Sequence, residues 1–418
     1  MNVKIKRGNI AGTIFAPSSK SFTQRYVLYS AFSNIPVNLN NISFSDDEII
    51  SIKIAEKCNA KIEYNRKNMH IIPDFRCPDR IYVGESGTSY RLTIGLLCAR
   101  GCNTDIHGEE SLAGRPVNIL VDALSQAGSL FTRKKDGFYA VNAKGSSNRA
   151  VQIDGSISSQ YVSAMLFYYS IIGKGAFTVN NAVSTNYLKI TENCLENFGV
   201  SIQEENGRYS ILQQTPKEIT VNVEGDYSSA SYFIVLGIFT GNIKIKNLNY
   251  LSVQPDRIVI DLINEATGCI KIGKDEIEVK KADVIKKIIV DAAESPDLAP
   301  VMSVIGIFSP EGVEIRNYSR LKVKESDRFS GIVGMCKSFG AAVTVTDSFI
   351  EIKKGELKFP DYIEYSDHRM IMSAVIAGII SGSGTEFGKC ESINKSYPEF
   401  LNDLKRIGLE IYFSPDLI

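Results

Sequence analysis

The chain has 418 residues, of which 44% are hydrophobic, and its 47 basic and 47 acidic side chains give a formal net charge of +0. This length and apolar fraction allow a large buried core. The balanced charge argues against a general nucleic-acid or membrane-surface binder, which would carry a basic excess. No apolar run reaches the roughly 18 residues of a membrane-spanning helix. The first ten residues, MNVKIKRGNI, alternate like a strand and lack a signal-peptide core, so we expect a cytoplasmic protein.

The positions of the histidines and cysteines argue against a metal site and against disulfide bonds. The three histidines, His70, His107 and His368, lie far apart in the sequence, so we expect no metal site. The eight cysteines are scattered and include no C-x-x-C pair. We predict that they are reduced thiols that pack in the core of a cytosolic protein.

The first strand leads directly into a polar cluster that recurs along the chain. APSSKSFTQR (16–25) runs into an apolar segment of helical character. The same form recurs at a period of roughly 70 residues. Its six copies begin at Ser18, Ser86, Ser158, Ser228, Ser295 and Ser366. We predict a helix at each copy, capped by Ser or Ser-Pro and buried because it is apolar on nearly all sides.

A second helical series keeps the same period. In each copy an amphipathic segment ends at a small residue and passes into an alternating strand. The small residues are Ala60, Gly128, Gly199, Gly268, Gly340 and Gly408. Glycine suits the position after a helix that requires a positive φ. The two interlocked series predict an α/β (α+β) fold of six βαβαββ-like repeats, with the second helix of each repeat on the outside.

Cationic side chains gather at these helix starts and on some of the second helices. They are Lys20, Arg25, Arg91, Arg115, Lys324, Arg328, Arg369 and Lys395. Solvated surface charge would explain any one of them, but their recurrence on equivalent elements favours an anion site. Helix starts attract anions without any net protein charge, and arginine suits phosphate and carboxylate groups.

Three carboxylates, Asp297, Glu325 and Asp367, lie among these cations. They are either ion-pair partners or groups that move protons, and His368 fits a structural role better than a catalytic one. The serine-rich SISSQ (156–160) could cap a helix or bind phosphate and hydroxyl groups. The residues alone predict a site for polyanionic small molecules between two halves of the chain, without a metal or nucleotide motif.

Eight segments, in order from residue 16 to 400, resemble the signatures of the 5-enolpyruvylshikimate-3-phosphate synthase family. They are APSSKSFTQR, GESGTSYR, GRPVNILVDAL, GSISSQY, VEGDYSSASYF, VKESDRF, YSDHRM and NKSYPEF. The resemblance implies a two-domain inside-out barrel with three repeats in each domain. It implies one domain of residues 1–19 plus 224–418 and another of residues 20–223, with the active site in the cleft between them.

The resemblance also implies the reaction. The enolpyruvyl group of phosphoenolpyruvate would pass to the 5-hydroxyl of shikimate 3-phosphate through a tetrahedral intermediate, with release of phosphate and without a cofactor. Asp297 matches the base for that hydroxyl, and Glu325 and Lys20 match the groups that exchange a proton with the methylene carbon. We expect a monomer with no nucleic-acid or membrane partner.

The resemblance also implies the binding residues, which are taken from their positions in the same motifs. Shikimate 3-phosphate would contact Lys20, Ser21, Arg25, Ser158, Ser159, Gln160, Ser184, Asp297 and Lys324. Phosphoenolpyruvate would contact Lys20, Gly87, Arg115, Gln160, Arg328, Arg369 and Lys395. Three positions depart from the common pattern: Glu85 replaces an Asn, Arg320 replaces an Asn, and Leu92 replaces a Pro. Gly87 is retained, and it leaves room for the inhibitor glyphosate in the family, so we expect sensitivity.

Three other interpretations fit less well. The related transferase that acts on UDP-N-acetylglucosamine has the residue pair KN near its start, where this chain has Lys20 and Ser21. It also carries a loop cysteine near the position of Ala113. An RNA-end cyclase would need a late catalytic histidine, for which His368 is the only candidate. A non-enzymatic binder would be expected to have lost groups such as Asp297 or Lys395, and these are present.

Overall fold

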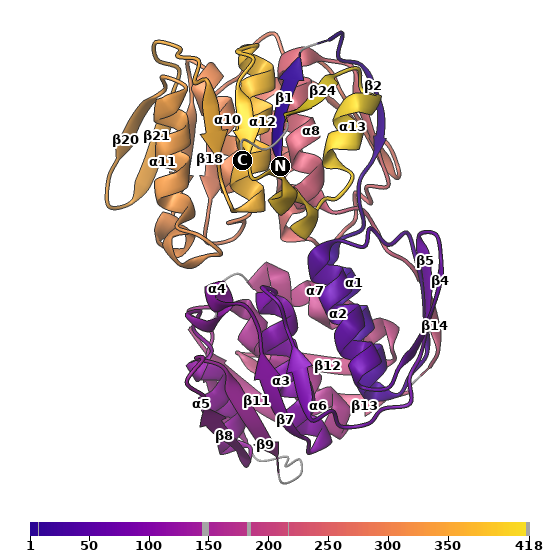
Figure 1. Cartoon of the computed structure of the whole chain (residues 1–418). Helices are drawn as coiled ribbons and strands as arrows, with labels where there is room; N and C mark the ends of the chain where they lie inside the picture. Colours follow the sequence, from indigo (N-terminus) through magenta and orange to yellow (C-terminus); the bar gives the residue numbers. More distant parts are fainter. Residues whose placement is uncertain (7, 144–149, 182–184, 216, 415–418) are drawn as a thin grey trace. The chain divides into compact units, whose positions relative to one another are not determined.

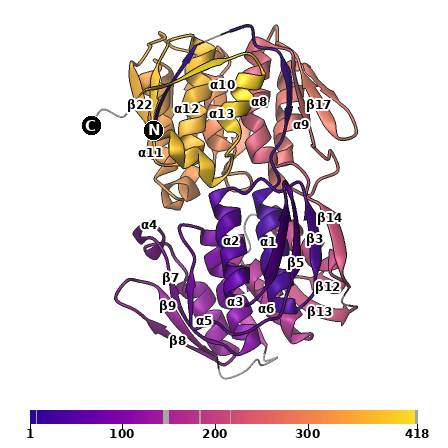
Figure 2. The same ribbon diagram turned by 45° about the vertical axis from the view of Figure 1, so that its right-hand side comes forward.

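The computed structural model describes residues 1–6, 8–143, 150–181, 185–215 and 217–414. The chain forms two compact units, which Figures 1 and 2 show from two sides. The inserted unit comprises Ser18–Val223, and the discontinuous unit comprises Met1–Pro17 together with Glu224–Ile418. The chain therefore passes from one unit to the other after Pro17 and again after Val223.

The inserted unit holds the helices and strands from α1 to β14. Its helices are α1 (Lys20–Ser33), α2 (Asp46–Lys57), α3 (Gly87–Arg100), α4 (Glu110–Ala113), α5 (Asn118–Gln126), α6 (Ser159–Ile172), the short η1 (Thr185–Tyr187) and α7 (Leu188–Asn197). Its strands are β3 (Val37–Asn40), β4 (Lys61–Asn65), β5 (Asn68–Ile72), β6 (Arg80–Tyr82), β7 (Asn103–His107), β8 (Ser129–Arg133), β9 (Tyr139–Ala143), β10 (Val151–Asp154), β11 (Gly175–Asn180), β12 (Val200–Glu205), β13 (Arg208–Gln214) and β14 (Ile219–Asn222).

The discontinuous unit holds the rest. Its helices are α8 (Tyr227–Thr240), η2 (Pro255–Arg257), α9 (Ile258–Thr267), α10 (Ala299–Phe308), η3 (Tyr318–Val323), α11 (Arg328–Ser338), α12 (His368–Ser381), η4 (Cys390–Lys395) and α13 (Phe400–Arg406). Its strands are β1 (Asn2–Lys6), β2 (Gly12–Phe15), β15 (Ile243–Lys246), β16 (Ile270–Ile272), β17 (Glu276–Val279), β18 (Ile288–Asp291), β19 (Val313–Arg316), β20 (Ala342–Val345), β21 (Phe349–Lys353), β22 (Tyr362–Glu364), β23 (Glu386–Gly388) and β24 (Glu410–Ser414).

Six four-stranded sheets, three in each unit, share one topology. In the sheet β18-β19-β21-β20 the first pair is parallel and the next two pairs are antiparallel. The helices α10 and α11 follow the first two strands, so the chain order is strand, helix, strand, helix, strand, strand. The six predicted βαβαββ repeats are thus confirmed.

Three strands are borrowed from distant parts of the chain. The strand β1 lies between β23 and β24, and β2 pairs in parallel with β15, so the first 15 residues complete two sheets of the discontinuous unit. In the inserted unit β14 pairs in parallel with β3, about 180 residues earlier in the chain. The apolar side chains Val3, Ile5 and Ile14 are buried, so the amino-terminal segment is part of the core.

The first helix of each repeat lies inside its unit, as the sequence predicts. In the discontinuous unit α8, α10 and α12 contact one another and are surrounded by the sheets (Figure 1). In the inserted unit α1, α3 and α6 pack together in the same way. Among the described helices, none is both long and apolar enough to cross a membrane.

The predicted serine caps are only partly correct. Ser19, Ser86 and Ser158 are the residues before α1, α3 and α6, and the hydroxyls of Ser86 and Ser158 accept backbone N–H bonds there. Aspartates take this place before α8 and α12, where the carboxylates of Asp226 and Asp367 accept the bonds. The helix α10 begins four residues after its predicted start at Ser295, because a turn comes first.

The glycines that end the second helices have the expected left-handed backbone. Gly128, Gly199, Gly268, Gly340 and Gly408 all have positive φ. The prediction for Ala60 was wrong by one residue, because Asn59 takes the positive φ of 72° after α2. Asparagine tolerates this conformation better than other residues with a Cβ atom.

We expect Gly340→Ala to destabilise the protein more than Gly268→Ala. Gly268 has a φ of 64° and nothing within 4 Å of an added Cβ, so alanine there costs about 1–2 kcal/mol of backbone strain. At Gly340 an added Cβ would lie 1.9 Å from the carbonyl oxygen of Glu356, so the backbone must move, at a cost of roughly 3 kcal/mol. Chemical denaturation measures both losses, and equal losses would contradict the steric argument.

Cys77 and Cys102 form a disulfide, with Cα atoms 5.4 Å apart. The expectation that all eight cysteines are reduced was wrong for this pair. The parallel pairing of β6 with β7 places Arg80 opposite Asp105, and three residues earlier the same register brings residue 77 opposite residue 102. The other six cysteines are free, and five of them are buried.

Short loops hold the chain where it leaves and enters each unit. In the inserted unit the side-chain amide of Asn41 donates to the carbonyl of Val223 (2.8 Å). In the discontinuous unit the carboxylate of Glu224 accepts bonds from Asn249 (2.9 Å) and Gln254 (2.7 Å). These bonds hold the two residues between which the chain passes from the inserted unit to the discontinuous unit.

Candidate active site

In the discontinuous unit, a buried ion-pair network centres on Arg328, the first residue of α11. Its Nη1 lies 2.7 Å from Asp297, its Nε lies 2.8 Å from Asp367, and its Nη2 lies 3.4 Å from Glu325. The Nη2 of Arg369, in the first turn of α12, lies 2.7 Å from the other oxygen of Asp297. Each oxygen of the Asp297 carboxylate is therefore held by one arginine.

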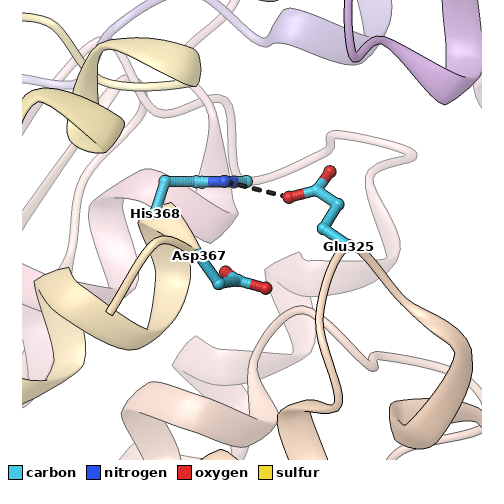
Figure 3. Close-up of side chains that lie close together, drawn as sticks. All are labelled: Glu325, Asp367 and His368. Carbon is cyan, nitrogen blue, oxygen red and sulfur yellow. Dashed lines mark ion pairs between the residues drawn. The ribbon is translucent and has the colours of Figure 1, made fainter. Parts of the chain in front are cut away.

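Glu325 joins this network to a histidine and a lysine. Its Oε2 lies 3.0 Å from Nδ1 of His368 and 3.9 Å from Nζ of Lys395. In Figure 3 the ring of His368, at the start of α12, points toward Glu325, which lies on the segment before α11. His368 thus has a partner in the network, which refines the structural role expected for it.

One carboxylate oxygen of Glu325, one of Asp367 and one ring nitrogen of His368 lie within 4.8 Å of one another, a spacing that would also suit a metal ion. Arg328 already donates to both carboxylates. Its guanidinium supplies the positive charge that this group of side chains requires, so the arrangement fits an ion-pair network.

The network shifts the pKa values of its carboxyl groups. Burial alone would raise the pKa of Asp297, but Arg369, Arg328 and Lys324 outweigh it and hold that pKa well below its usual range. Burial would also raise the pKa of Glu325, but the charges of His368 and Lys395 lower it more strongly. The pKa of Glu325 is therefore also well below its usual value. Both groups are therefore carboxylates at neutral pH.

Two further groups in this unit have altered proton affinities. Burial lowers the pKa of the Lys324 ammonium to about 8, against the opposing effect of Asp297. Burial, together with the charge of Asp297, raises the pKa of Asp256 to about 6, and Asp256 accepts a hydrogen bond from Ser228 at the start of α8. Asp256 was missed in the sequence because a single aspartate in η2 carries no pattern.

In the inserted unit the predicted residues lie at the starts of the inner helices. Lys20, the first residue of α1, forms an ion pair with Asp47 of α2 (2.8 Å). Arg25 is buried one turn further on, where its Nε donates to the hydroxyl of Thr191 (2.7 Å) and its Nη1 to the carbonyl of Ser21 (2.8 Å). Burial lowers the pKa of Arg25 to about 10.

Two further arginines, Arg91 and Arg115, lie close to Gly87 at the start of α3. The Nη1 of Arg91 donates to the side-chain oxygen of Gln160 (2.6 Å), and Gln160 donates to the hydroxyl of Thr88 (2.9 Å). A Cβ added to Gly87 would lie 3.0 Å from Nη1 of Arg91 and 3.2 Å from Nη1 of Arg115. Any side chain at position 87 would therefore press on both guanidinium groups.

Arg25 and Arg91 differ from Arg328 and Arg369 of the discontinuous unit in their partners. Within the described part of the chain, the hydrogen bonds of Arg25 and Arg91 go only to neutral oxygen atoms. Burial lowers the pKa of Arg91, and the neighbouring Arg115 adds to that effect. Charged groups are costly to bury without a counterion, so this arrangement suits an anionic ligand.

The remaining predicted residues lie as follows. Ser158 is the cap of α6, and its hydroxyl accepts the N–H of Gln160. Ser159 is the first residue of α6 and is buried. Glu85 accepts a hydrogen bond from Ser111 (2.7 Å), and Arg320 donates to the carbonyl of Ala293 (3.0 Å). Ser184 lies outside the described residues.

The fold is that of the enolpyruvyl transferases. The structure resembles EPSP synthase from Acinetobacter baumannii, with a TM-score of 0.80 and 22% identity over 99% of this chain and 100% of that one. It also resembles the enolpyruvyl transferase NikO from Streptomyces tendae, with a TM-score of 0.79 and 16% identity over 99% and 98% of the two chains.

Sequence comparison identifies the family. The family described as EPSP synthase (3-phosphoshikimate 1-carboxyvinyltransferase) matches residues 5–404. A relative from Picrophilus torridus is 48% identical over 98% of this chain and 100% of its own length, and one from Thermoplasma volcanium is 44% identical over 96% and 98%. Both are named 3-phosphoshikimate 1-carboxyvinyltransferase. The chain belongs to the EPSP synthase family, which confirms the family predicted from its motifs.

Proposed function

We propose that the protein transfers the enolpyruvyl group of phosphoenolpyruvate to the 5-hydroxyl of shikimate 3-phosphate and releases phosphate. The observation that carries this proposal is the Asp297 carboxylate, held by Arg328 and Arg369 and influenced by Lys324. A base that lies among cations suits a reaction in which a hydroxyl attacks an anionic substrate. The family membership supplies the identity of the two substrates.

The substrates would be held by residues of both units. We propose that shikimate 3-phosphate contacts the nine residues predicted for it, with Arg25 and Lys324 as its principal cations. We propose that phosphoenolpyruvate contacts Arg115, Arg328, Arg369 and Lys395 as its principal cations. Among the described residues Arg25 has no carboxylate partner, which suits binding of shikimate 3-phosphate. Arg328 and Arg369 are bound to a carboxylate, which suits a site where phosphoenolpyruvate lies beside the base.

The proton transfers can be assigned from the charge states. Asp297 takes the proton of the 5-hydroxyl as that oxygen bonds to C2 of phosphoenolpyruvate. The methylene carbon C3 must gain a proton in the same addition, and we assign its donor as the Lys20 ammonium, because the low pKa of Glu325 leaves that group ionised. In the elimination Glu325 removes a proton from C3, the C2–C3 double bond forms, and phosphate leaves with the electrons of its C–O bond.

Binding of phosphoenolpyruvate would also strengthen the base. Arg369 and Arg328 lower the pKa of Asp297, which makes it a weak base. An anionic substrate that shares these guanidinium groups reduces their effect on the carboxylate, so its pKa rises toward the usual value. The base would therefore become effective when the second substrate is present.

The proposed activity is tested by phosphate release from phosphoenolpyruvate with purified protein. We expect release only when shikimate 3-phosphate is also present. Release with UDP-N-acetylglucosamine instead would assign the protein to the related transferase. Tight binding of shikimate 3-phosphate without any release would indicate a binding protein. We also propose that the protein is a cytoplasmic monomer. Sedimentation velocity of the purified protein tests the oligomeric state.

We expect the kcat/KM for shikimate 3-phosphate to fall as pH rises through about 8. The pKa of Lys324 is lowered to about 8, so the ammonium that would bind the substrate loses its charge above that pH. In Lys324→Arg the fall should move to higher pH, because guanidinium stays charged. A pH profile that is the same in both proteins would contradict the assignment of Lys324.

A further inference from the structure

A buried carboxylate in the inserted unit has a hydrogen bond that helix capping does not explain. Glu48, in the first turn of α2, is 0% exposed. Its Oε2 accepts a bond from the backbone N–H of Ser45 (2.8 Å), which is one half of the capping box at the start of α2, and a further bond from the hydroxyl of Ser45 (3.0 Å). Its Oε1 accepts a bond from the hydroxyl of Ser18 (2.7 Å), which belongs to a different element.

Ser18 is the first residue of the inserted unit along the chain. Its backbone N–H donates to the hydroxyl of Ser43 (2.6 Å), and the N–H of Ser43 donates to the hydroxyl of Ser18 (2.9 Å). Ser18 is therefore fixed to the loop between β3 and α2 through both its backbone and its side chain. It comes two residues before Lys20, the first residue of α1.

The starts of α1 and α2 are tied together by two neighbouring carboxylates. Glu48 holds Ser18, and Asp47, one residue earlier, holds Lys20 (2.8 Å). The loop that supplies Ser43 also contains Phe44, whose φ is 54°. A bulky residue in the left-handed region is strained and persists only where the surroundings determine it, so the loop is held in one conformation.

We propose that Glu48 is a positioning residue for Lys20: through Ser18 it fixes the first turn of α1, so that the Lys20 ammonium stays at the reacting carbon. This rests on the proposed function, in which Lys20 delivers a proton. Burying a carboxylate without a cation is unfavourable, and burial raises the pKa of Glu48. A cap alone would not need this buried bond to a second element.

The test compares two serine variants that each remove one bond to Glu48. Ser18→Ala removes the bond to Oε1, together with the hydroxyl that accepts the N–H of Ser43. Ser45→Ala removes the hydroxyl bond to Oε2 and keeps the backbone N–H bond to the same atom. Glu48→Ala removes all three bonds to the carboxylate, and Glu48→Gln keeps an acceptor and a group that can bond to Ser18. For each protein three quantities are measured: kcat and KM for both substrates, the thermal midpoint, and the rate of reductive methylation of the Lys20 amine by mass spectrometry.

We expect Ser18→Ala and Glu48→Ala to lower kcat by about 10- to 100-fold, the size of effect that misplacement by about 1 Å produces. We expect Lys20 to be methylated several-fold faster in both, because its ion pair with Asp47 is less well held. Ser45→Ala should lower the thermal midpoint but keep kcat and the methylation rate near those of the unmodified protein. Glu48→Gln should recover most of the lost kcat.

Three results would overturn the proposal. They are an unchanged methylation rate in Ser18→Ala, an equal loss of kcat in Ser45→Ala, and a Glu48→Gln protein as impaired as Glu48→Ala. If the unmodified protein releases no phosphate, the proposed function fails. The methylation rates then still decide whether Glu48 and Ser18 position Lys20.

Discussion

We expect Asp297→Ala to lower the kcat for phosphate release by at least about 100-fold, the contribution of a positioned general base, and at the same time to strengthen the binding of phosphoenolpyruvate. Asp297 occupies Nη1 of Arg328 and Nη2 of Arg369, both at 2.7 Å. Without this carboxylate, both guanidinium groups are available to the phosphate or carboxylate of the substrate. Loss of rate combined with tighter binding is the expected signature of a base that shares its cations with the substrate.

Steady-state kinetics and calorimetry of phosphoenolpyruvate binding measure the two effects separately. Asp297→Asn keeps the shape of the side chain and removes its charge, so it should show the same loss of kcat with a smaller gain in binding. Glu311→Ala removes an exposed carboxylate of the same unit and should change neither quantity. An unchanged kcat in Asp297→Ala would exclude the base assignment, and weaker binding would exclude competition for the arginines.

Arg328→Met has the largest expected effect on stability, a loss of about 3–5 kcal/mol in the free energy of unfolding. Arg328 is 2% exposed and serves three carboxylates, Asp297, Glu325 and Asp367. Methionine fills much of the volume but leaves the buried Asp367 and the partly buried Asp297 and Glu325 without their shared cation. Arg328→Lys should recover only part of the loss, because one ammonium cannot reproduce three separate N–H directions.

The pH dependence gives a second test of this network. The pKa values of Asp297, Glu325 and Asp367 in the folded protein are all lowered, and Arg328 contributes to each shift. Groups with lowered pKa values stabilise the fold above their unfolded pKa of about 4, and this contribution is lost as pH falls through the folded values. The difference in stability between Arg328→Met and the unmodified protein should therefore shrink below about pH 4.

Denaturation curves at several pH values measure this difference. Arg316→Ala is the matched control, because Arg316 pairs with Glu314 but is 53% exposed. We expect it to change stability by no more than about 0.5 kcal/mol. A loss of similar size in Arg328→Met would show that the buried network contributes little to stability.

The sequence by itself determined the repeats and most of the candidate site. The apolar helices and the terminal glycines recur because each repeat must bury one helix and end the other in a left-handed turn, and both requirements are local. The cations at the helix starts follow from the same repeats, which is why Arg25, Arg328 and Arg369 could be selected without a structure. Family membership was predictable because its motifs are short and contiguous.

Only the tertiary structure decided which of these residues meet. The strand β1 completes the sheet of β23 and β24, the parallel register of β6 and β7 brings Cys77 to Cys102, and Glu48 reaches Ser18 from another helix. Each of these contacts joins residues 25 or more apart in the chain, and no local pattern encodes such a pairing. The low pKa of Asp297 has the same origin, because it depends on two arginines from the first turns of α11 and α12.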